Sequence, residues 1–351
     1  RFGLRITLFA GLAVQIVALL MLSATNPAWT AFFSVGYVMV AQALSGVAKD
    51  LTKMSSKSAV KLVVASDEAG LLFRWVAVLT GSKNALKGVG FLLGGVMLEG
   101  LGFTHALYAM AGMLAVVLAT ALLTIKADLG RAKSKIGKRD LFAKTREINF
   151  LSAARIFLFA SRDVWFVVGV PVFLYDQLGW SFDRVGLFMA VWVVGYGIVQ
   201  ALVPRLLRRT RDAGAAARGA VLWGGVLALL PALIAAGLTP GWMPAGLTSG
   251  DAPAIILVGG LLLFGVVFAV NSALHSYLIV AYSDTDKVAL NVGFYYMANA
   301  VGRFAGTLLS GLVYQLAGLT ATLWVSAAMV LLAVMLTVPL SGGRRAIPQS
   351  G

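Results

Sequence analysis

Ten long apolar runs, separated by polar gaps, constrain this chain more than any other feature of its sequence. A helix needs roughly 20 mostly apolar residues to cross a bilayer, and each run is long enough or nearly so. Of the 351 residues, 60% are hydrophobic and 12% charged, whereas soluble domains carry about 25% charged residues. The sequence therefore predicts an all-α polytopic membrane protein. Its expected spans are 6–24, 28–48, 84–103, 104–125, 151–175, 184–204, 217–238, 253–279, 289–313 and 319–340.

The gaps between these runs alternate in charge. Every second gap holds lysine or arginine, and the others hold none. Because basic loops stay on the cytoplasmic side, we expect both chain ends to face the cytoplasm of a bacterial inner membrane. The net charge of +15 then faces anionic lipid. Nucleic acid is not an expected partner, since the basic segments lack the aromatic platforms that such binding uses.

The basic gap at 126–150 divides the spans into a first bundle of four, 1–125, and a second bundle of six, 151–340, followed by a tail at 341–351. When the basic loop at 204–214 is aligned with the opening RFGLR as an internal repeat, the first bundle lacks two spans. We therefore expect an N-terminally truncated piece of a twelve-span protein. The first bundle also holds a cytoplasmic insert at 51–82, in which 68–81 is expected to form an amphipathic or partly buried helix at the cytoplasmic surface.

The residue types argue against several kinds of chemistry. The chain has no cysteine and two histidines, so we expect no metal site and no cofactor. A membrane enzyme or a non-transporting sensor is one possible class of protein. Such a protein would need a nucleophile–base pair, a metal cluster or a sizeable soluble domain, and none is visible in the sequence. The expected protein is not an enzyme, and we expect it to be a monomer.

Ionisable side chains inside the predicted spans are the first candidates for function, because placing them there costs at least roughly 2.5–3.5 kcal/mol. Arginine binds phosphate or carboxylate oxygens in pairs, so the excess of cations predicts an anionic ligand. Asp163 has two readings, since it could pair with a neighbouring cation and fix two helices together, or take part in coupling. The predicted substrate-binding residues within the spans are Arg155, Arg162, His275, Asn299 and Arg303.

A lysine series follows the second apolar run. Lys49, Lys53, Lys57 and Lys61 are four residues apart, so they share one face if the helix continues past Leu51. The series is either a positive anchor at the cytoplasmic interface or the mouth of an anion pathway. On the second reading Lys49, Lys53 and Lys57 bind substrate, as does Lys87 at the start of a later span. The acids Asp50 and Glu99 are candidates for charge pairing or coupling.

The six-plus-six pattern with a long basic linker resembles the major facilitator superfamily. The signature loop of that superfamily reads roughly G-x-L-x-D-R-x-G-R-[RK], and RFGLR at residues 1–5 fits its tail. The resemblance implies two halves with a substrate site between them near the midplane. It also implies that Arg1, Gly3 and Arg5 belong to a loop that takes part in conformational switching.

Three stretches, 42–64, 75–95 and 161–175, resemble the organoarsenical efflux branch of that superfamily, the ArsJ transporters. This resemblance implies export of 1-arseno-3-phosphoglycerate, which glyceraldehyde-3-phosphate dehydrogenase forms when arsenate replaces phosphate. The expected function is therefore arsenate resistance by efflux. The alternative is a transporter of another phosphorylated or carboxylated metabolite, since nothing in the sequence separates arsenate from phosphate esters.

Overall fold

The structure, a computed structural model, describes residues 4–63, 69–125, 145–206, 213–239, 241, 252–283 and 288–341. Regular structure in these ranges is helical throughout. Eight of the helices described there are long and apolar enough to cross a membrane. The prediction of an all-α polytopic membrane protein is confirmed.

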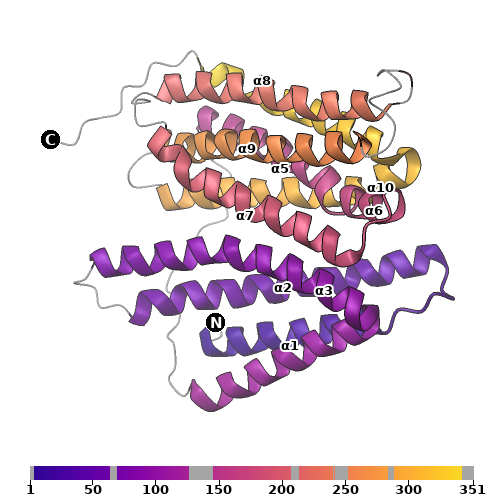
Figure 1. The fold of residues 1–351 in the computed structure, drawn as a ribbon. Helices are drawn as coiled ribbons and strands as arrows, with labels where there is room; N and C mark the ends of the chain where they lie inside the picture. Colours follow the sequence, from indigo (N-terminus) through magenta and orange to yellow (C-terminus); the bar gives the residue numbers. More distant parts are fainter. Residues whose placement is uncertain are drawn as a thin grey trace. The chain divides into compact units, whose positions relative to one another are not determined.

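The chain divides into two compact units, and the first comprises Arg1–Lys135 and Phe182–Ala190. It holds α1 (Leu4–Ser23), α2 (Ala31–Val63) and α3 (Ala69–Thr124), all visible in Figure 1. Helix α3 breaks at Gly102, where φ is 71°, a backbone conformation that glycine adopts without a steric cost. The predicted spans 84–103 and 104–125 are thus the two parts of α3.

Helix α1 packs against both of its neighbours in the first unit. Leu19 of α1 contacts Leu107 and Ala111 in the second part of α3. On the other side, the Ser45 hydroxyl of α2 donates a hydrogen bond of 2.9 Å to the Gln15 side-chain oxygen of α1. These contacts hold three spans of the first unit together.

The segment 51–82 differs from the prediction. Helix α2 continues to Val63 and α3 begins at Ala69, so most of the segment lengthens these two helices. The expected helix at 68–81 is the first part of α3, because residues 69–81 run into the following span without a break; its place at the cytoplasmic surface stays a prediction. No proline interrupts them, and extending a helix costs less than nucleating a new one.

The second unit comprises Ile136–Ser181 and Val191–Gly351. Its helices are α5 (Arg146–Phe166), α6 (Gly169–Asp176), the later part of α7 (Phe182–Leu206), α8 (Ala213–Leu238), α9 (Ala252–Ala281) and α10 (Val288–Thr337), followed by a 3₁₀ turn, η3 (Val338–Leu340). Helix α10 contacts α5 and α8, and α8 contacts α9 (Figure 1). The core that they share includes Leu151, Ala216, Leu274 and Tyr295.

Two boundaries in the second unit differ in detail from the prediction. Helix α5 begins at Arg146, five residues before the expected span, because the Thr145 side chain accepts a hydrogen bond from the Ile148 amide and caps the helix. Helix α10 breaks at Gly318, where φ is 73°, and so provides the two predicted spans 289–313 and 319–340.

The remaining linker residues 126–144 and the tail 342–351 lie outside the described residues. The expectation of two further spans before residue 1 stays a prediction.

Candidate substrate site

A row of small residues on α10 lets this helix pack closely against α5, which brings Arg303 of α10 against α5. A Cβ atom at Gly302 would overlap the Ile156 carbonyl group, and one at Gly306 would lie 2.7 Å from the Ala160 carbonyl oxygen. One turn further, the Ser310 hydroxyl accepts hydrogen bonds of 3.1 and 3.2 Å from the amides of residues 168 and 169, where the α5 helix has ended. The two backbones therefore touch, which is the purpose of small residues at membrane helix interfaces.

This close approach places Arg303 beside Asp163. The Arg303 Nε atom donates to Asp163 Oδ2 at 3.0 Å, and the Arg162 Nε atom donates to Asp163 Oδ1 at 2.6 Å. The side chains of Asp163 and Arg162 are 1% and 8% exposed, whereas that of Arg303 is 42% exposed. One buried carboxylate is therefore shared by two guanidiniums from two helices, and only one of these is accessible.

Arg155 lies two turns earlier on α5 and has other partners. Its Nε donates to Asn299 Oδ1 at 3.2 Å, and its Nη1 donates to the carbonyl and hydroxyl oxygens of Ser272 at 3.3 and 3.1 Å. Its Cζ lies 4.0 Å from the centroid of the Phe159 ring and 4.8 Å from that of Tyr295. The predicted residues Arg155 and Asn299 are thus brought together, in direct contact with each other.

Aromatic rings pack around Arg155 and Arg162 of α5. The Arg162 Cζ lies 5.0 Å from the Phe159 centroid and 5.5 Å from that of Phe268. Arg155 and Arg162 therefore contact the same ring, as their spacing of seven residues on one helix face predicts. Such cation–π contacts contribute about 2 kcal/mol when they are desolvated. We refer to Arg155, Arg162, Arg303 and Asp163 as the arginine cluster, whose three guanidiniums and one carboxylate leave a net positive charge.

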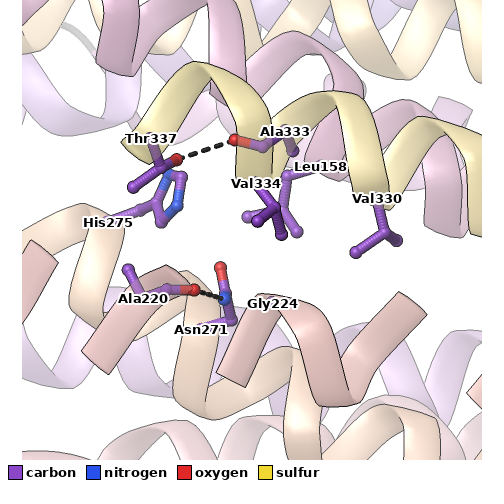
Figure 2. Close-up of a pocket in the computed structure, with 9 residues that line it drawn as sticks. All are labelled: Leu158, Ala220, Gly224, Asn271, His275, Val330, Ala333, Val334 and Thr337. Atoms are coloured by element: carbon purple, nitrogen blue, oxygen red, sulfur yellow. Dashed lines mark hydrogen bonds between the residues drawn. The ribbon is translucent and has the colours of Figure 1, made fainter. Parts of the chain in front are cut away.

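His275 lies in a crevice lined by residues of α5, α8, α9 and α10 (Figure 2). Its side chain is buried, and its Nδ1 atom has no hydrogen-bond partner among the described residues. Asn271, one turn earlier, donates to the Ala220 carbonyl oxygen at 2.7 Å, and the opposite wall is formed by Val330, Ala333 and Val334 of α10. The crevice leaves essentially no room for a water molecule, so it is far smaller than the roughly 300–1,000 Å³ of ligand pockets.

The lysine series lies on one helix. Because α2 is continuous to Val63, Lys49, Lys53 and Lys57 follow one another along the same side of its backbone. Lys49 is exposed, while the side chains of Lys53, Lys57 and Asp50 lie outside the described residues. On α3, Lys87 is half-buried. The choice between anchor and pathway stays open for this series.

The remaining predicted residues of the first unit are only partly described. Arg5 lies in the first turn of α1, with its Cζ 5.4 Å from the centroid of the Phe9 ring, while Arg1 and Gly3 lie outside the described residues. Glu99 accepts a hydrogen bond of 2.9 Å from the Phe182 amide at the start of α7. A carboxylate at a helix N-terminus is favourable, so Glu99 stabilises the start of that helix.

Sequence reasoning missed the residues that position the arginines. Gly302 and Gly306 form a small-xxx-small pattern, GRFAG, with Arg303 inside it, and this pattern could have predicted the contact with α5. Ser272 and Phe159 gave no comparable signal, because a serine or a phenylalanine in a span is ordinary.

Comparisons with known proteins bear on the fold. No family model matches the chain, and no curated protein matches it. Among solved structures, a bacterial homologue of the iron transporter ferroportin in its inward-facing state is similar at 16% identity, with 98% of this chain and 84% of that chain covered and a TM-score of 0.68. A POT family transporter in complex with a thioalcohol-conjugated peptide is 12% identical, with 97% of this chain and 82% of that chain covered and a TM-score of 0.66. A D-xylose–proton symporter is 15% identical, with 99% of this chain and 82% of that chain covered and a TM-score of 0.57.

These structures define the class of fold. The chain has a transporter fold of the major facilitator type, as the six-plus-six pattern predicts. All three of these solved structures are transporters. Their cargoes differ, and at these identities the likeness concerns the fold alone. Within the described ranges, no group of three or more His, Asp or Glu side chains is placed to hold a metal ion.

Proposed function

We propose that this protein is a membrane transporter that exports a multiply charged organic anion by alternating access. The arginine cluster carries this proposal, since it gathers three guanidiniums inside the second unit with a single carboxylate, which pairs with Arg162 and Arg303 only. A buried charge that is not neutralised is costly. An anion with several charges is therefore the ligand that such a site favours, and arginine's planar fork suits phosphate oxygens.

The first candidate for the cargo is 1-arseno-3-phosphoglycerate, on the resemblance of three stretches to the ArsJ transporters. That molecule carries a phosphate and an arsenate group, which suits a cationic site. The proposal includes a functional link to glyceraldehyde-3-phosphate dehydrogenase, a place in the bacterial inner membrane with both ends cytoplasmic, and a monomeric state. The alternative cargo is another phosphorylated or carboxylated metabolite.

The membrane potential is sufficient to drive this export. Moving one charge across 100 mV corresponds to about 2.3 kcal/mol. A cargo of charge about −3 would therefore gain roughly 7 kcal/mol from an inside-negative potential. Collapsing the pH gradient alone, with the potential held constant, should leave transport nearly intact; loss of transport would instead show coupling to protons.

The test uses inside-out membrane vesicles that contain the complete natural chain. The vesicles receive arsenate, glyceraldehyde 3-phosphate, NAD and the dehydrogenase, and the arsenic that accumulates inside is counted. We expect accumulation only when every component is present. In sealed and energised vesicles, no accumulation of arsenic would exclude the arsenical cargo, and uptake of labelled 3-phosphoglycerate by the same vesicles would then test the alternative.

A further inference from the structure

Asp163 occupies the position that an oxyanion ligand would take. Arginines hold carboxylate and phosphate groups through short, charge-assisted hydrogen bonds from more than one donor. In the arginine cluster the Asp163 carboxylate is held in this way, by Arg162 through Oδ1 and by Arg303 through Oδ2. The chain therefore supplies its own anion to two of the cations that are expected to bind cargo.

The two arginines hold this carboxylate unequally. Arg162 is 8% exposed, contacts Oδ1 through both Nε and Nη2, and packs against Phe159 and Phe268. Arg303 is 42% exposed and contacts Oδ2 through Nε at 3.0 Å. An incoming anion can therefore reach Arg303, while Arg162 is enclosed and remains with Asp163.

We propose that Asp163 is an exchangeable internal counter-ion, which a phosphate group of the cargo displaces from Arg303 while Arg162 retains it. This inference rests on the proposed function and adds how the site releases its cargo. Leaving a buried charge unpaired is strongly unfavourable. With Asp163 present, Arg303 has an anionic partner both before cargo binds and after it leaves, so release does not require an unpaired guanidinium.

The decisive variant is Asp163→Asn, with inorganic phosphate and 3-phosphoglycerate as the probes. Removing the competing carboxylate should lower the Kd of both probes about ten- to a hundredfold, as expected for one charge-assisted hydrogen bond that no longer has to be broken. Dissociation of 3-phosphoglycerate should slow in proportion. A merely damaged protein would bind more weakly, so tighter binding cannot arise from loss of structure.

Asp176→Asn is the matched control. It removes one carboxylate from the exposed end of α6, on the same membrane segment, and should leave both Kd values unchanged. If folded Asp163→Asn binds the probes with unchanged or weaker affinity, the counter-ion role is overturned while the anion site of the proposed function stands. If the wild-type protein binds neither probe, the proposed function itself fails, and this inference with it.

A second measurement needs no variant, in case Asp163→Asn does not fold. Wild-type protein labelled with ¹³C at its aspartate carboxyl groups is examined by difference infrared spectroscopy with and without phosphate. Displacement of Asp163 from Arg303 should shift one aspartate carboxylate band. Saturating phosphate without any change in the aspartate bands would overturn the proposal.

Discussion

Arg155 and Arg303 belong to the same pair of packed helices, yet they have opposite surroundings. Arg155 is 4% exposed, donates to Asn299 and Ser272, and is covered by two aromatic rings. Arg303 is 42% exposed and shares the Asp163 carboxylate with Arg162. A buried cation with every side covered stabilises a fold, whereas an accessible one with a shared partner can exchange that partner. From this comparison we predict a structural role for Arg155 and ligand contact for Arg303.

The largest loss of stability should come from breaking the close contact between α5 and α10, on which the positions of Arg155 and Arg303 both depend. Gly302→Val places a side chain where the Ile156 carbonyl lies, and backbone cannot yield as a side chain can. We expect a loss of about 3 kcal/mol or more, at or beyond the upper end for overpacking. The yield of monodisperse protein and its unfolding temperature measure it.

Gly293→Val is the control for that change, on the same helix but with open space around its Cβ. It should behave nearly as the wild type. Equal damage by both variants would show that α10 does not depend on the close approach to α5.

Arg155→Gln should come next in size. It removes the Arg155 donor from the Ser272 hydroxyl oxygen and the cation from beside the Phe159 and Tyr295 rings, which we expect to cost about 2–4 kcal/mol. Thermal unfolding measures this loss. Arg146→Gln, an exposed arginine on the same helix, should change stability little. Normal stability of Arg155→Gln together with lost phosphate binding would make Arg155 a ligand residue and contradict the comparison.

Arg303→Gln should show the reverse pattern. Asp163 keeps Arg162 as its partner, so the loss of stability should be about 1 kcal/mol. Accumulation of cargo in inside-out vesicles should nevertheless fall at least tenfold, about 1.4 kcal/mol of binding free energy. Vesicles that carry equal amounts of wild-type and variant protein provide the measurement. Unimpaired accumulation would show that Arg303 does not contact cargo.

The smallest effect is expected outside the cluster, at Glu99. Glu99→Gln keeps an oxygen that can accept from the Phe182 amide and loses only the charge at the start of α7. The expected change in stability is about 0.5 kcal/mol, with transport retained. If transport driven by a pH gradient disappears in this variant, Glu99 carries protons rather than serving only as a helix cap.

The sequence was sufficient for the spans and for the placement of two of the cluster arginines on one face of a helix. Apolar length and charge alternation predicted the helices, and the spacing of Arg155 and Arg162 predicted that both lie on one side of α5. The partners could not be predicted, because Ser272 and Asn299 meet Arg155 only through tertiary packing. The continuity of residues 69–81 with the following span was also not predicted. An amphipathic stretch can either lie on a membrane or extend a span, and the sequence does not distinguish the two.

The central claim is that the site recognises a phosphorylated anion, and competition binding tests it most directly. Purified wild-type protein is equilibrated with labelled 3-phosphoglycerate, and unlabelled phosphate, glycerol, D-xylose and ferrous ion are added in turn. We predict saturable binding that phosphate displaces and that glycerol, xylose and iron leave unchanged. Displacement by xylose or by iron, or equal competition by uncharged glycerol, would contradict an anion site and assign the arginine cluster to structure alone.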